Sequence, residues 1–158
     1  MKKVAIFPGS FDPFTIGHES LVIRALQLFD KIIIAVGQNT QKHGFFSIDA
    51  RMDMIRKTFE NNEKIEVDYY DGLTVDYCRK KNIYFIIRGL RTSADFEFER
   101  SVGQVNKQLE RKVETVFLLT STKYTPISSS IVRDILANGG NATQFISNKI
   151  NIDDYLNK

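Results

Sequence analysis

Cysteine, long apolar runs and an excess of one charge are all scarce in this chain. Cys78 is the sole cysteine among 158 residues, so it cannot form a disulfide within the chain, and we expect a buried, inert thiol. No apolar stretch reaches the roughly 18 residues that a membrane span needs. The apolar run at 4–7 stops at Pro8-Gly9, too early for the core of a signal peptide. These absences predict an intracellular, cytoplasmic protein.

Charge is also spread evenly. The net charge of +3 arises from 22 basic and 19 acidic residues without a long basic run, so the sequence predicts no nucleic-acid or membrane partner. The apolar content of 42% and the charged content of 26% are ordinary for a globular protein. A chain of this length buries about 70% of its unfolded surface, and we expect one domain over residues 1–158.

Short β-rich apolar runs alternate with segments of helical periodicity, which is typical of an α/β protein. Right-handed crossovers between such strands give a doubly wound parallel sheet, with ligands bound at the carboxyl ends of the strands. This geometry nominates the loops 8–15, 37–46, 89–94 and 120–128. The predicted strands are 4–7, 32–36, 65–69, 84–87 and 116–119; the predicted helices are a first one containing Leu21, Ile23, Arg24, Leu26 and Leu28, then 48–59 capped by Ser47, 74–81, 96–109, 129–138, and one or two short ones within 143–156.

The first of these loops carries the strongest chemical signal. Residues 8–18 read Pro-Gly-Ser-Phe-Asp-Pro-Phe-Thr-Ile-Gly-His, a strand end followed by a turn and the start of an amphipathic helix. Unpaired N–H groups at a helix start favour phosphate. Gly17 would let phosphate approach the backbone, and His18 could add a hydrogen bond to a phosphoryl oxygen. Taken alone, His18 could equally be a histidine that faces solvent.

The stretch 11–18 resembles the T/H-x-G-H signature of the nucleotidyltransferase superfamily and closely matches its phosphopantetheine adenylyltransferase family. Two further stretches are similar to that family's other signatures. Ile-Arg-Gly-Leu-Arg at 87–91 with Asp-Phe-Glu-Phe-Glu at 95–99 resembles the second, and Ile-Ser-Ser-Ser-Ile-Val-Arg at 127–133 resembles the third. The resemblance therefore covers nearly the whole chain and implies a Rossmann-like nucleotidyltransferase fold with C-terminal helices.

Several residue roles follow from this resemblance. It implies that His18, Lys42 and Arg91 are catalytic, and that ATP and the acceptor share Ser10 and Phe11. The sequence departs from the family pattern at Ser10, where threonine is usual, at Phe98, where tyrosine is common, and at Pro126, where an aromatic residue is frequent. The implied ATP-binding residues are Ser10, Phe11, His18, Gly89, Leu90, Arg91, Glu99, Tyr124, Thr125, Pro126, Ile127, Ser128, Ser129 and Ser130, and those for the acceptor are Ser10, Lys42, Thr74 and Arg88.

Residue chemistry supports some of these roles independently. Lys42 follows the second strand, where a mobile positive charge suits phosphate, although a solvated loop lysine is the alternative. Arg88 and Arg91 could bind two phosphates, or form surface ion pairs with Asp95 or Glu97. In the stretch 128–130, one serine would cap a helix and leave the others for phosphate.

The resemblance implies transfer of the adenylyl group of ATP to 4′-phosphopantetheine by in-line attack, with no covalent enzyme intermediate. Mg²⁺ would be held mainly by ATP phosphates and water, because no carboxylate cluster is visible, and we predict no protein metal ligand. A homohexamer and feedback inhibition by coenzyme A are further implications.

Two alternatives use the same fold. Another superfamily transferase could act on nicotinamide mononucleotide or glycerol phosphate, since the first loop alone does not specify the acceptor. A nucleotide sensor or a dinucleotide-dependent oxidoreductase is also conceivable. Against the oxidoreductase, the first loop has no G-x-G-x-x-G and no acidic residue ends the second strand.

Overall fold

The computed structural model describes residues 1–38, 41 and 43–156. Five parallel strands form one sheet in the order β3-β2-β1-β4-β5, which confirms the predicted doubly wound α/β fold. Ligands bind in such sheets where the order reverses, and here β1 lies between β2 and β4. The strands are β1 (Val4–Gly9), β2 (Lys31–Gln38), β3 (Ile65–Asp71), β4 (Phe85–Leu90) and β5 (Glu114–Leu119).

Helices connect the strands as predicted, with two corrections at their ends. The fourth helix begins at Ser93 rather than Phe96, because the Thr92 hydroxyl caps it by accepting the N–H of Asp95. Ser47 caps the second helix as expected. The helices are α1 (Ile16–Ala25), α2 (Ile48–Thr58), α3 (Thr74–Lys81), α4 (Ser93–Leu109), α5 (Ser129–Ala137), α6 (Asp153–Leu156) and the 3₁₀ turns η1 (Thr122–Tyr124) and η2 (Thr143–Phe145).

The prediction that the first helix includes Leu26 and Leu28 was wrong. The helix ends at Ala25, and Leu26 is its C-cap. Beyond it the chain turns toward β2, and just before that strand the N–H of Asp30 donates to the carbonyl of Lys3 at 2.8 Å. This turn buries Phe29 in the core and leaves Leu28 more than half exposed.

Successive side chains of each strand point to opposite faces of the sheet, and the apolar core is therefore divided into two layers. Alternate residues of β2, such as Ile32 and Ile34, belong to the core cluster that also contains side chains of α1 and α2. Their neighbour Ala35 packs instead with Ile6 of β1 and with Val75 and other residues of α3. The sheet is thus covered on both faces, and its carboxyl edge is left for the loops.

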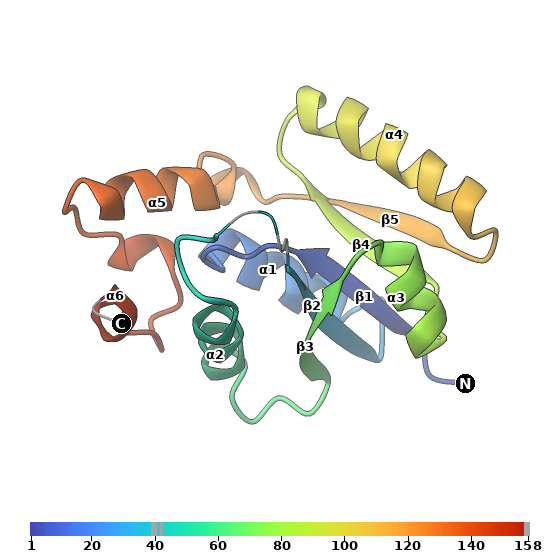
Figure 1. The fold of residues 1–158 in the computed structure, drawn as a ribbon, viewed down its shortest axis with the longest axis horizontal. Helices are drawn as coiled ribbons and strands as arrows, with labels where there is room; N and C mark the ends of the chain where they lie inside the picture. The colour runs from blue at the N-terminus through green and yellow to red at the C-terminus, as the bar shows by residue number, and fades with distance from the viewer. Residues whose placement is uncertain (39–40, 42, 157–158) are drawn as a thin grey trace.

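The segment after β5 packs against α2 rather than against the sheet. Figure 1 shows α5 and α6 beside α2, on the side of the molecule away from α4. Their shared cluster joins Met54 of α2 to Val132 and Leu136 of α5 and to Tyr155 of α6, so the short docking helices predicted within 143–156 are confirmed. Over residues 1–38, 41 and 43–156, none of the helices has the length and apolar content that crossing a bilayer requires.

Candidate active site

The start of α1 fixes the position of His18. Thr15 is the N-cap, and its hydroxyl accepts the N–H of His18 at 3.4 Å. In return, the Thr15 N–H donates to Nδ1 of His18 at 2.9 Å. This arrangement is a capping box with histidine at the position that glutamate or glutamine usually occupies. The imidazole is therefore oriented by the backbone of its own helix.

These contacts also define which nitrogen of His18 carries the proton. An N–H can only donate, so Nδ1 must present a lone pair to Thr15 and the proton of the neutral ring lies on Nε2. Burial lowers the pKa of His18 to about 4, assisted by the positive charges of Arg91 and Arg88. At neutral pH His18 is thus an uncharged donor through Nε2.

Aromatic rings pack around the imidazole. The ring of Phe11 lies edge-on to it, with centroids 5.1 Å apart, and that of Phe14 lies 5.2 Å away. Phe11 adopts a left-handed φ of 47°, and its ring occupies the space that a Cβ on Gly9 would need, 2.7 Å from that position. A Cβ at residue 9 would therefore displace the Phe11 ring from its place beside His18.

A cavity of about 340 Å³ opens in front of His18. It lies at the carboxyl ends of β1 and β4 and at the N-termini of α1 and α5, where main-chain N–H groups and the helix dipoles favour an anion. Gly89 passes so close to α1 that a Cβ there would lie 2.5 Å from Leu21. The predicted site residues that line this cavity are Ser10, Phe11, His18, Arg88, Gly89, Arg91, Glu99, Ile127, Ser128, Ser129 and Ser130.

Arg88 and Arg91 both have acidic partners. Arg88 forms a two-pronged ion pair with Glu99 of α4, through Nη2 at 2.6 Å and Nε at 2.8 Å, and its Nη1 donates to the Pro8 carbonyl at 2.6 Å. Arg91 lies 3.6 Å from Asp95. The sequence suggested Asp95 or Glu97 as partners for both arginines. Arg91 does pair with Asp95, whereas Arg88 pairs with Glu99.

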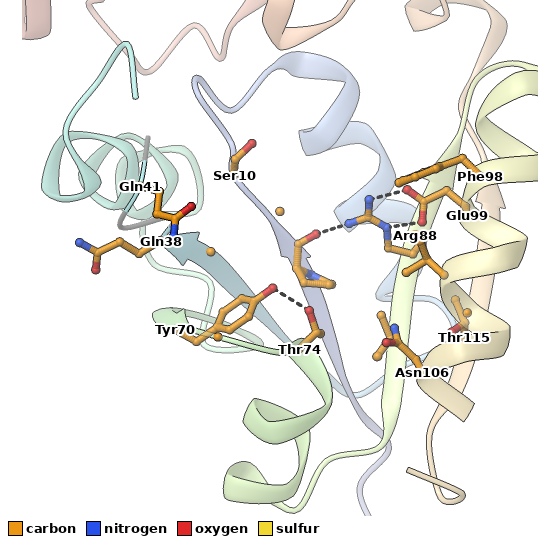
Figure 2. A pocket seen from close by; sticks show the side chains of 17 residues that line it. Ser10, Gln38, Gln41, Tyr70, Thr74, Arg88, Phe98, Glu99, Asn106 and Thr115 are labelled. Carbon is orange, nitrogen blue, oxygen red and sulfur yellow. Dashed lines mark hydrogen bonds and ion pairs between the residues drawn. The ribbon is translucent and has the colours of Figure 1, made fainter. Parts of the chain in front are cut away.

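Arg88 and Glu99 also form a wall of a second, larger cavity of about 630 Å³ (Figure 2). Thr74 lies across this cavity, and its hydroxyl is 2.9 Å from that of Tyr70. Apolar and amide side chains of α4, including Val102 and Asn106, complete the lining. Ser10 lines both cavities, so the two spaces meet at the end of β1.

The three serines at the start of α5 are all engaged. Ser128 is the N-cap and accepts the N–H of Ile131. Ser129 donates to the Pro13 carbonyl at 2.8 Å, and Ser130 accepts from Arg133 at 3.2 Å. The expectation that two hydroxyls remain for phosphate is wrong for Ser129, whose O–H donates to the first loop. Ser130 accepts from Arg133, so its own O–H can still donate to a phosphate oxygen. The helix N-terminus itself still faces the His18 cavity.

Other predicted site residues are not brought to the cavities. Leu90 is buried at the end of β4, and Tyr124, Thr125 and Pro126 lie in or just after η1, outside the lining of both cavities. Tyr124 instead lines a separate depression with residues of α1 such as Ile16. Lys42 lies outside the described residues.

Sequence reasoning gave Thr15 no role, although Thr15 holds His18. A signal was present, because Thr15 and His18 have the three-residue spacing of a capping box. The signal is weak, because the N3 position of a capping box is usually glutamate or glutamine and here is histidine.

The carboxylates beside His18 are poor ligands for a cation. Glu99 is committed to Arg88, and Asp95 accepts the N–H of Arg91 at 3.1 Å. Among the described residues, no group of three or more histidine, cysteine or acidic side chains could hold a metal ion.

Known proteins resemble the chain over nearly its whole length. The cytidylyltransferase-like family model matches residues 6–135. A phosphopantetheine adenylyltransferase of Cytophaga hutchinsonii is 49% identical over 95% of this chain and 100% of that protein. A protein of the same name from Flavobacterium johnsoniae is 47% identical over 96% of this chain and 99% of its own length.

Solved structures agree on the fold. A bifunctional NMN adenylyltransferase/ADP ribose pyrophosphatase from Francisella tularensis superposes with a TM-score of 0.72 at 18% identity. It covers 95% of this chain, and the chain spans 46% of that larger protein, so this likeness concerns the fold alone. The high identity to full-length relatives, together with the three matching motifs and the nucleotidyltransferase fold, shows that the chain belongs to the phosphopantetheine adenylyltransferase family of nucleotidyltransferase enzymes.

Proposed function

We propose that this enzyme transfers the adenylyl group of ATP to 4′-phosphopantetheine, giving dephospho-coenzyme A and pyrophosphate. One observation carries the proposal. A small cavity with anion-binding helix ends and a neutral histidine donor adjoins a larger, partly apolar cavity, and Ser10 and Arg88 line both. Such a pair of spaces suits a nucleotide phosphate chain on one side and a phosphorylated, elongated acceptor on the other.

In this reaction a phosphate oxygen of the acceptor attacks the α-phosphorus of ATP. A new phosphorus–oxygen bond forms as the bond to the bridging oxygen of pyrophosphate breaks, in line and without an enzyme-bound intermediate. Phosphoryl chemistry of this kind depends on positioning and on dispersal of negative charge. The protein therefore has to hold two substrates and place donors around one phosphorus atom.

His18 supplies a donor at this phosphorus. His18 lines the cavity at the start of α1, and its hydrogen bond with the Thr15 N–H leaves Nε2–H as the ring's donor. A donor that is already oriented needs no rearrangement as charge develops on the transferring phosphoryl oxygens. Arg91 adds positive charge on the ATP side, and Lys42 is proposed to do so on the acceptor side.

The remaining residues divide between the two substrates. ATP phosphates would lie against the N-terminus of α5 at Ser128 to Ser130 and against Gly89. The acceptor phosphate would lie near Ser10 and Arg88, and its pantetheine arm would extend past Thr74 into the larger cavity. Leu90, Glu99 and residues 124–127 stay proposed ATP-binding residues, and Glu99 would act by holding Arg88.

The metal belongs to the substrate in this proposal. Nucleotidyltransferases of this family generally use a divalent ion, and we propose Mg²⁺ bound to the β- and γ-phosphates of ATP, where it would neutralise charge on the leaving pyrophosphate. Arg91 and the α5 N-terminus would then orient the complex.

Self-association is a further part of the proposal. Phe98, Val105 and Leu109 lie on one side of α4 and are each about half exposed or more, which is unusual for an apolar stripe that serves no contact. We propose that α4 contributes to a homohexamer, which light scattering would measure. Coenzyme A shares its adenylyl and pantetheine parts with the product and would compete for the same cavities as a feedback inhibitor.

A pyrophosphate-release assay tests the activity. The enzyme is given MgATP with 4′-phosphopantetheine, dephosphorylated pantetheine or nicotinamide mononucleotide. We expect turnover with the first and none with pantetheine, which lacks the nucleophilic phosphate. Preference for nicotinamide mononucleotide would overturn the acceptor assignment, and pyrophosphate release that no acceptor stimulates would overturn the transfer reaction itself.

A further inference from the structure

Asp12 lines neither cavity, yet it lies where separate parts of the chain meet. Its side chain is 7% exposed. Oδ2 accepts the N–H of Phe45 at 2.7 Å, and Oδ1 accepts the N–H of Phe46 at 2.9 Å. The carboxylate thus joins the loop that leads into α1 to the segment that leads into α2. Hydrogen bonds to an ionised carboxylate are about twice as strong as neutral ones.

Arg51 of α2 holds the same loop from the other side. It is also 7% exposed, and its Nη1 donates to the main-chain carbonyl of Ser10 at 2.8 Å. Its Nε is buried without a hydrogen-bond partner. Burying a guanidinium with an unsatisfied nitrogen is costly, so this arrangement is a poor source of stability. An arginine that aligns Ser10 offers a reason for it.

Gly44 leaves the space in which these groups approach one another. A Cβ at this position would lie 2.8 Å from the Phe46 carbonyl oxygen, 3.1 Å from Oδ2 of Asp12 and 3.5 Å from Nη2 of Arg51. A methyl group there would displace the carboxylate or the main chain. Asp12, Arg51 and the main chain of Gly44 to Phe46 therefore form one close-packed unit, which we call the Asp12 junction.

The junction is continuous with the end of α5. Arg133 donates to the carbonyl of Asp12 at 2.8 Å, and Ser129 donates to that of Pro13 at 2.8 Å. Side chains from α2 and α5 thus hold three carbonyls of the loop between Ser10 and His18. The loop has little freedom to move while these contacts persist.

We infer that Asp12 and Arg51 are positioning residues for the transfer reaction, and that they act by aligning Ser10 at the meeting point of the two cavities. The inference rests on the proposed function, in which Ser10 contacts both substrates. Misplacing a contact by about 1 Å can cost roughly 100-fold in rate. The junction would therefore influence kcat although neither side chain reaches the substrates.

The test uses Asp12→Asn and Gly44→Ala in the full chain, each alone and combined with Ser10→Ala. Asp30→Asn is the matched control, because the Asp30 carboxylate also accepts a main-chain N–H, that of Lys3 at 2.7 Å, and lines neither cavity. Steady-state kcat and both KM values are measured below the thermal transition of every variant. We expect Asp12→Asn and Gly44→Ala to lower kcat by about 10- to 100-fold, and to lower it far less when Ser10 is already alanine.

Two results would overturn the inference. One is an equal loss from Asp12→Asn in the presence and absence of the Ser10 hydroxyl; the other is a lower melting temperature with unchanged kcat, as expected for Asp30→Asn. If Asp12→Asn does not fold, Gly44→Ala allows the same comparison with and without the Ser10 hydroxyl, and it removes no charge. Hydrogen exchange on the wild-type protein adds a check, because unprotected amides at Phe45 and Phe46 would also contradict the junction. A wild-type protein inactive toward 4′-phosphopantetheine would instead contradict the proposed function.

Discussion

The two cavities hold their polar groups by different means. Around His18 the main chain sets the geometry, since the Thr15 N–H orients the imidazole and Ser128 caps the helix that faces it. In the larger cavity, side chains hold one another: Tyr70 pairs with Thr74, and Arg88, on the wall that both cavities share, pairs with Glu99 (Figure 2).

This difference suits two tasks. A donor fixed by the backbone is ready for charge that appears only in the transition state, and it pays no cost of reorganisation. Paired side chains can exchange partners when a ligand enters, which suits the recognition of a long, flexible acceptor. We therefore expect substitutions around His18 to change kcat, and substitutions in the larger cavity to change KM or kcat/KM for the acceptor.

The largest effect is expected from His18→Ala. Removing the oriented donor should lower kcat by roughly 10²- to 10⁴-fold with a smaller change in ATP affinity, because the contact strengthens as charge develops. Single-turnover kinetics and calorimetric ATP binding would measure the two quantities. His43→Ala is the matched control, since His43 is exposed. Unfolding of His18→Ala with normal activity in its folded fraction would assign His18 a structural role.

Arg88→Ala should come next and should act on the acceptor. Loss of one charge-assisted contact should lower kcat/KM for 4′-phosphopantetheine by roughly 10- to 150-fold and leave ATP binding nearly unchanged. Stability should also fall, because Glu99 is 8% exposed and would lose its partner.

Two further variants separate these effects of Arg88. Arg88→Ala combined with Glu99→Gln should regain stability without regaining acceptor use. Arg79→Ala breaks a different arginine–glutamate pair, with Glu110 at 2.7 Å, and should leave the kinetics unchanged. If Arg88→Ala raised KM for ATP alone, Arg88 would contact ATP and not the acceptor, and the two cavities would not differ in the way described above.

The sequence predicted the framework of both cavities better than their contacts. Alternating apolar runs determine the sheet, and the stretch 8–18 marks the turn that carries His18. The partner of Arg88 was not predictable, because Arg88 lies on β4 and Glu99 on α4, and the two side chains meet only when this helix packs on the sheet. The serines at 128–130 were taken as phosphate ligands, yet Ser129 holds Pro13, which is 116 residues away in the chain. Contacts of this range depend on packing that local patterns do not encode.

A small effect is expected from Thr74→Val. The change keeps the shape of the side chain and removes the hydroxyl that lies 2.9 Å from that of Tyr70. A neutral hydrogen bond contributes about 0.5 to 1.5 kcal/mol, so KM for the acceptor should rise by no more than about 10-fold. Steady-state kinetics with each substrate varied would measure it. A large loss of kcat would mean that Thr74 lies nearer the reacting phosphorus than the larger cavity suggests.

The smallest effect is expected from pH. Because burial lowers the pKa of His18 to about 4, the ring stays neutral from pH 6 to 8, and kcat should show no inflection near the ordinary histidine pKa of about 6.5. Stability should nevertheless depend on His18 at lower pH. Between about 6.5 and 4 the unfolded chain binds a proton at this residue that the folded chain does not, so the folded state loses stability as pH falls through that range. Protonation would also place a hydrogen on Nδ1 against the Thr15 N–H, and this contact opposes protonation further.

The pKa of His18 can be measured in His43→Gln, where His18 is the one remaining histidine. Its imidazole resonance can be followed from pH 8 to 4. A midpoint near 6.5 would make His18 a cation during part of the working range and would contradict a donor whose proton is fixed on Nε2 by the backbone.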